Sequence, residues 1–99
     1  MTEDVTAVFV ANDQMALGVL KALGEAGRAV PGDVSIVGLD GIPGAAFFQP
    51  ALTTVRLDFA AVGHRCVARL LAMMRGETAE PEPPIDPQLI VRATAAAPR

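Results

Sequence analysis

The sequence predicts an α/β domain in which a mainly parallel sheet is flanked by helices. The first observation is that short apolar runs alternate along the chain with longer segments of helical periodicity. The second is that these runs are rich in β-branched residues and nearly free of charge, as strands buried on both faces are. With 52% hydrophobic and 19% charged residues among 99, the chain has the composition of a folded domain.

The first predicted strand is the apolar run Thr6–Ala11, and Asn12-Asp13 directly after it supplies the N-cap of a helix. We interpret Asp13 as a plain cap. Apolar residues at helical spacing extend this helix over Gln14–Ala26. Gly27 then occupies the position at which glycine commonly closes a helix.

The middle of the chain predicts two further strands. Val34–Leu39 follows a Pro-Gly-Asp turn and reads as a buried strand that ends at Asp40. Pro43–Pro50 is predicted as a loop or a short helix, and Leu52–Leu57 as the third strand. Two of the predicted strands have the apolar composition of central strands, which are paired on both sides. We infer that the chain is half of a larger α/β unit.

The last third predicts a long helix and a final strand. Asp58 is placed to cap a helix over Phe59–Arg75, which Gly76 ends. The proline-rich and acidic stretch Glu77–Pro87 is predicted to be an irregular connection. Gln88–Ala93 is short and apolar enough to form the last strand.

The apolar arc of the first helix is about twice the roughly 100° that a core contact needs, at 100° per residue. Leu17 and Leu20 extend it to one flank of a centre that we assign to five residues: Met15, Val19, Ala22, Leu23 and Ala26. We expect the surplus flank to be covered by a second subunit or by a further part of the same protein. The Phe59–Arg75 helix, in contrast, has the single apolar side of an ordinary surface helix.

Charge and motifs argue against several function classes. The net charge is −3 and Lys21 is the only lysine, so these residues lack the clustered basic face of a DNA-binding domain. No phosphate-binding loop, metal-ligand cluster or catalytic constellation is present, so we expect no enzyme, no metal and no cofactor. His64 and Cys66 point about 200° apart on a helix, and we interpret Cys66 as a small core residue.

Targeting signals are also missing from the sequence. No apolar run is long enough to span a bilayer, and the first residues do not resemble a signal peptide. The single cysteine cannot form a disulfide within the chain. We therefore expect a cytoplasmic protein with no membrane partner.

Polar side chains follow the ends of the predicted strands, where open α/β sheets bind ligands. Asn12 offers a donor and an acceptor, and Asp40 offers only acceptors. This pair suits polyhydroxylated ligands, amines or ring N–H groups better than phosphate. Turn chemistry is the alternative explanation for both residues.

Three strings in order resemble a known family: TAVFVANDQMALG over residues 6–18, VPGDVSIVGLD over residues 30–40 and PALTTVR over residues 50–56. Gly63 and the string LIVR over residues 89–92 follow at the family's spacing. They are very similar to motifs of the lactose-repressor/galactose-repressor (LacI/GalR) family of transcription regulators. The resemblance implies a type I periplasmic-binding-protein-like fold, of which residues 1–99 would be a partial, C-terminal portion of the effector-binding domain.

The resemblance also implies roles for particular positions. Asn12 and Asp40 match effector-binding residues, and Phe59 matches an aromatic residue that packs on the effector. Leu17 and Phe48 match dimer-interface positions. We also assign Leu20 to this interface, because it lies on the surplus apolar flank with Leu17. Leu57 departs from the family, since relatives usually carry a polar residue there, and Gly41 replaces a common acidic residue.

Residues of about 6–50 and 88–94 would then form the C-terminal subdomain, while about 51–76 would cross to the N-terminal one. We expect a small-molecule effector such as a sugar or nucleoside, a homodimer, and DNA contact only through an N-terminal headpiece absent from these residues. A periplasmic sugar-binding receptor of a transport system is the alternative, which the DG pair at residues 40–41 keeps open.

Overall fold

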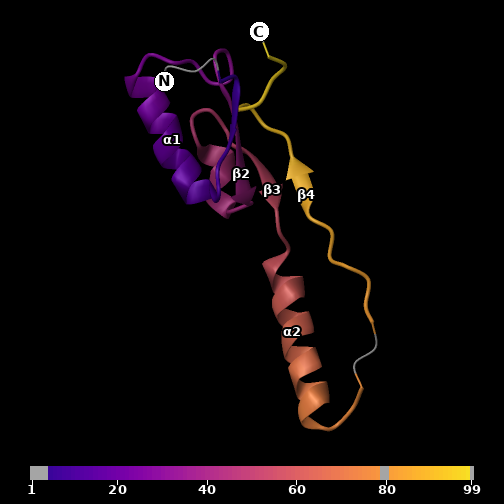
Figure 1. The fold of residues 1–99 in the computed structure, drawn as a ribbon. Coiled ribbons are helices and arrows are strands. Elements are labelled where there is room, and N and C mark those ends of the chain that lie inside the picture. The colour runs from indigo at the N-terminus through magenta and orange to yellow at the C-terminus, as the bar shows by residue number, and fades with distance from the viewer. Residues whose placement is uncertain (1–4, 79–80, 99) are drawn as a thin grey trace. The chain divides into compact units, whose positions relative to one another are not determined.

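The computed structural model describes residues 5–78 and 81–98 (Figure 1). The chain divides into two compact units, Met1–Arg56 with Gln88–Arg99 and Leu57–Pro87. The first unit contains the sheet and the first helix, and the second contains the long helix and the connection after it.

The first unit is a four-stranded, mostly parallel sheet, as the alternation of strands and helices predicts. The strand order follows the chain: β1 (Ala7–Phe9), β2 (Ser35–Asp40), β3 (Thr53–Arg56) and β4 (Gln88–Ile90). β1 and β3 both pair with β2 in parallel, and β4 pairs with β3 in antiparallel. The helix α1 (Asp13–Glu25) connects β1 to β2, and the 3-10 helix η1 (Pro43–Phe47) connects β2 to β3 (Figure 1).

The division between the two units falls after Arg56, and the expected crossing to an N-terminal subdomain at about residue 51 stays a prediction. The division falls there because β3 is paired with β2 along its whole length, from Thr53 to Arg56. The C-terminal segment closes the same unit through Thr94. Its Oγ1 accepts from the Thr53 amide at 2.8 Å and donates to the Ile36 carbonyl at 2.7 Å.

The N-cap of α1 is Asn12 rather than Asp13. Asn12 has extended backbone angles, and its Oδ1 accepts from the Met15 amide at 2.8 Å, as an N-cap side chain does. Asp13 is already the first residue of the helix, so the interpretation of Asp13 as a plain cap is wrong. Gly27 ends the helix as predicted, with a φ of 74°.

The face of α1 that enters the core differs from the predicted one. Asp13, Ala16 and Leu20 are the buried residues of the helix, at positions that share one face. Met15, which we expected at the centre of the buried arc, is 54% exposed. Leu20 is only 8% exposed and lies in the core cluster, so its predicted role in a subunit interface is wrong.

The core lies between α1, the sheet and η1. It consists of seven buried apolar residues: Val10, Ala16, Leu20, Val34, Ile36, Ala45 and Leu52. β2 is largely buried, as predicted. β1 is not buried on both faces, since Ala7 and Phe9 are exposed and Phe9 has 62% of its surface accessible.

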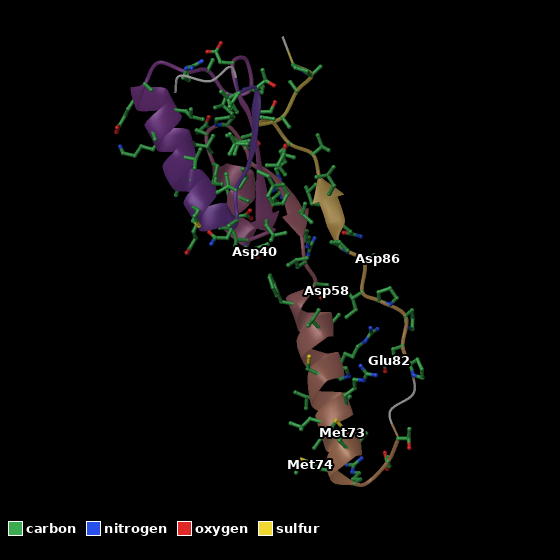
Figure 2. All side chains as sticks on the ribbon, in the orientation of Figure 1. Asp40, Asp58, Met73, Met74, Glu82 and Asp86 are labelled. Carbon is green, nitrogen blue, oxygen red and sulfur yellow. The ribbon has the colours of Figure 1, made fainter. Side chains whose placement is uncertain are left out.

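The second unit is built on α2 (Phe59–Met74), which begins as predicted. Asp58 Oδ1 accepts from the Ala61 amide at 2.9 Å and caps the helix. None of the residues of α2 is buried in the described part of the chain, and Met73 and Met74 lie exposed at its end (Figure 2). Cys66 is exposed as well, which contradicts its interpretation as a core residue.

Candidate functional site

Asn12 and Asp40 lie at the same edge of the sheet. β1 and β2 are parallel, and Phe9 lies opposite Val37. Asn12 comes three residues after Phe9, and Asp40 comes three residues after Val37. Figure 2 shows Asp40 at the end of β2. The carboxyl ends of parallel strands are where α/β sheets bind ligands, so the predicted pair is brought to one candidate site.

Asp40 has a backbone conformation that side chains rarely adopt. Its φ is 123°, and that of the next residue, Gly41, is 75°. A non-glycine residue in such a region costs about 1–3 kcal/mol and persists only where the surrounding structure holds it. The half-buried Asp40 is opposite Arg56 in the pairing of β2 with β3.

The carboxylate of Asp13 lies directly behind this turn and is fully buried. Its Oδ2 accepts from the backbone amides of Gly41, at 3.0 Å, and Ile42, at 2.9 Å. Its Oδ1 accepts from the hydroxyl of Thr54 on β3 at 2.6 Å. One side chain thus joins the start of α1 to the turn after β2 and to the neighbouring strand.

Gly38 provides the space for that carboxylate. A Cβ at Gly38 would lie 2.3 Å from Asp13 Oδ1 and 3.1 Å from Leu52 Cδ2. Asp13 therefore packs behind the turn that carries Asp40, a placement that sequence reasoning missed. The available signal was its helical spacing with Ala16 and Leu20, which places it on the apolar face that packs on the sheet.

The remaining predicted residues are distributed over both units. Phe59 begins α2 in the second unit and is 57% exposed. On α1, Leu17 is 50% exposed, and its place in a dimer interface stays a prediction. Phe48 follows η1 and is partly buried against the core.

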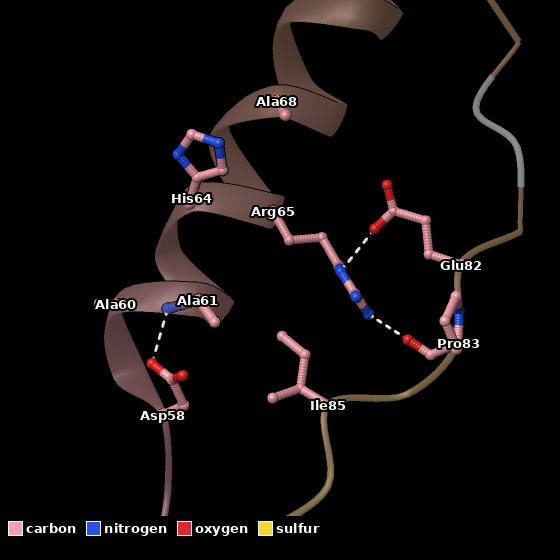
Figure 3. A pocket seen from close by; sticks show the side chains of 9 residues that line it. All are labelled: Asp58, Ala60, Ala61, His64, Arg65, Ala68, Glu82, Pro83 and Ile85. Atoms are coloured by element: carbon pink, nitrogen blue, oxygen red, sulfur yellow. Dashed lines mark hydrogen bonds and ion pairs between the residues drawn. The ribbon is translucent and has the colours of Figure 1, made fainter.

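Hollows of the described residues also lie outside the Asn12–Asp40 edge. One, of about 310 Å³, lies on the first unit and is lined by Val19, Ala22, Leu23, Ala26 and Arg28. A second, of about 710 Å³, lies in the second unit and is lined by nine residues: Asp58, Ala60, Ala61, His64, Arg65, Ala68, Glu82, Pro83 and Ile85. In the second, Arg65 pairs with Glu82 and donates to the Pro83 carbonyl (Figure 3), so its cationic group already has partners.

The described residues contain no group of three or more side chains suited to hold a metal ion. Across the same residues, no helix combines the length and the apolar character that crossing a membrane requires.

Comparison with known proteins matches residues 2–95 to the family described as periplasmic binding protein-like domain. The lactose operon repressor of Klebsiella pneumoniae is 44% identical over 91 residues, covering 92% of this chain and 26% of the relative. The transcriptional regulator MalR of Streptomyces coelicolor is 46% identical over 97 residues, covering 96% of this chain and 28% of the relative. The chain thus spans about a quarter of the length of these curated relatives.

Solved structures agree with this match. A crystal structure of the Lac repressor dimer bound to operator and the anti-inducer ONPF superposes with a TM-score of 0.85 and 39% identity. The superposition covers 93% of this chain and 32% of that one. These relatives are transcription regulators, and the family model spans nearly the whole chain. The chain therefore belongs to the periplasmic-binding-protein-like domain family, among the effector-binding domains of LacI/GalR transcription regulators.

Proposed function

We propose that this chain is the effector-sensing and dimerising part of a transcription regulator that binds a small molecule such as a sugar or nucleoside. The observation that carries the proposal is the placement of Asn12 and Asp40 in matching register at the carboxyl edge of parallel strands. The Asp40 carboxylate accepts hydrogen bonds from hydroxyl or N–H groups, and the amide of Asn12 can still donate while its oxygen caps α1.

The effector acts by changing the balance between two conformations of the regulator. A ligand shifts such a balance only by its difference in affinity for the two states. In the proposal, Asn12 and Asp40 contact the effector through hydrogen bonds, and Phe59 contacts it through its apolar ring.

In the proposal, DNA is contacted by a headpiece outside these residues, since their net charge of −3 is unsuited to binding phosphates. A regulator that binds DNA works in the cytoplasm, which remains our prediction for this protein. The relatives reported above regulate transcription, and this does not favour the alternative of a periplasmic receptor.

Asp40→Ala in the full-length regulator is expected to weaken effector binding by about 10- to 150-fold. This is the contribution of a hydrogen bond to a charged group, about 1.5–3 kcal/mol. Calorimetric titration with sugars and nucleosides measures the affinity. Asp33→Ala is the matched control, because Asp33 lies in the turn before β2, at the other end of that strand. Unchanged affinity in Asp40→Ala, together with a lowered melting temperature, would leave Asp40 as a turn residue only.

Leu17→Glu is expected to raise the dissociation constant of the homodimer by about 100-fold, because it places an unpaired charge in an apolar interface. Sedimentation velocity of the full-length regulator measures the change. Ala22→Glu is the matched control, since it adds the same charge at an exposed position of the same helix that lies about 140° around the helix from Leu17 at 100° per residue. The interface assignment is wrong if both variants sediment like the unchanged protein.

A further inference from the structure

The strongest unexplained feature of the first unit is the buried carboxylate of Asp13. A charged group without solvent is tolerated in a protein only where hydrogen bonds replace its hydration. Asp13 has three such bonds, and two of them come from consecutive backbone amides, those of Gly41 and Ile42. A helix cap would bond to amides of its own helix, so these bonds serve a different element.

The two amides belong to the residues that directly follow Asp40. Asp40 itself has a φ of 123°, so the chain changes direction there in a conformation that needs external support. The carboxylate supplies that support from α1, through a side chain that is anchored by Thr54 at its other oxygen. The position of the Asp40 side chain is therefore set by contacts that Asp40 does not make itself.

The Asp40-Gly41 turn and the end of β2 are closely packed against their neighbours. A Cβ at Gly38 would meet the Asp13 carboxylate at 2.3 Å, and a Cβ at Gly41 would meet three atoms of Arg56 at 2.8 Å. Both glycines are thus required by close neighbours. The turn is held from one side by Arg56 and from the other by Asp13.

We propose that Asp13 is a positioning residue: its buried carboxylate holds the Asp40-Gly41 turn and thereby orients the Asp40 carboxylate toward the effector. The inference rests on the proposed function for the role of Asp40. It assigns no effector contact to Asp13, which is fully buried behind the turn. Asp13 acts through the backbone of residues 40–42.

The first experiment measures hydrogen exchange of single amides in the full-length regulator without effector. Asp13→Ala is expected to speed exchange at Gly41 and Ile42 about 100-fold relative to the amides of β2. Asp13→Asn keeps one carbonyl oxygen as an acceptor, so a smaller change of about tenfold is expected. The isosteric variant also keeps the test decisive if Asp13→Ala does not fold.

Thr94→Val is the matched control for a merely structural role. Thr94 is also fully buried and its hydroxyl makes two hydrogen bonds, but they tie Thr53 and Ile36 rather than the turn. This variant is expected to speed exchange at Thr53 with no selective change at Gly41 and Ile42. Unchanged exchange at the turn in Asp13→Asn, or the same change in Thr94→Val, would overturn the inference.

The second experiment is a double-mutant cycle of Asp13→Asn and Asp40→Ala, with lactose, sucrose and adenosine as the binding probes. If Asp13 acts through Asp40, Asp13→Asn weakens probe binding when Asp40 is present. In the Asp40→Ala background, the same substitution causes no further loss of affinity. Additive losses would overturn the inference. Failure of the proposed function has a different signature, because Asp40→Ala would then leave affinity intact while the exchange experiment still reports on the turn.

Discussion

Gly38→Ala is expected to lower the free energy of unfolding by about 3 kcal/mol, although it adds a single methyl group. The new Cβ would lie 2.3 Å from Asp13 Oδ1 on one side and 3.1 Å from Leu52 on the other. β2 is paired with strands on both sides and cannot move away, so the carboxylate of Asp13 must. Its hydrogen bonds to the turn and to Thr54 are then lost while the charge stays buried.

Gly18→Ala is the control for this prediction. Gly18 lies within α1, and nothing is found within 4 Å of a Cβ built there. Replacing it is expected to stabilise the protein by about 0.5–1 kcal/mol, because alanine loses less conformational freedom in a helix than glycine. Chemical denaturation of the full-length regulator compares the two variants. Equal stabilities would contradict the close contact between Gly38 and Asp13.

Gly41→Ala is expected to cost about 3–4 kcal/mol, because two unfavourable effects coincide at this residue. Its φ of 75° disfavours any side chain, and a Cβ would lie 2.8 Å from the Cα, Cβ and Cγ atoms of Arg56. A backbone atom of a paired strand cannot give way as the end of a flexible side chain can. Since the turn carries Asp40, effector affinity is expected to fall along with stability.

Gly27→Ala separates the two effects. Gly27 has nearly the same φ, 74°, but nothing lies within 4 Å of a Cβ built on it. Its replacement is expected to cost about 1 kcal/mol, which is the conformational part alone. Thermal melts of both variants, with titration of effector, measure the difference. A Gly41→Ala variant as stable as Gly27→Ala would show that the contact with Arg56 relaxes without cost.

The order and type of the elements follow from local signals, and they could be predicted. Apolar runs define the strands, and Asp58 and Gly27 mark a helix start and a helix end, because caps act on residues close in sequence. The carboxyl edge with Asn12 and Asp40 could be predicted too, since parallel strands bring their ends together. The family motifs lead to the same fold as the comparisons.

The face of α1 that enters the core was decided only by tertiary contacts. An apolar arc about twice the usual width has no single best side, and hydrophobic periodicity alone placed Met15 inside. The three hydrogen bonds of Asp13 instead turn the side with Ala16 and Leu20 toward the sheet. Their partners lie 28 to 41 residues away in the chain, so no local pattern reveals them.

The sequence by itself determined the α/β elements of this protein, the edge that carries its candidate site and its family. The tertiary structure alone decided that Asp13 is buried behind the site and that Leu20 is in the core, while Leu17 is exposed. The physical reason is that a polar atom can be buried only where groups far away in the sequence form hydrogen bonds with it. A carboxylate is an exposed cap or an internal bridge according to the amides and hydroxyls that folding places around it.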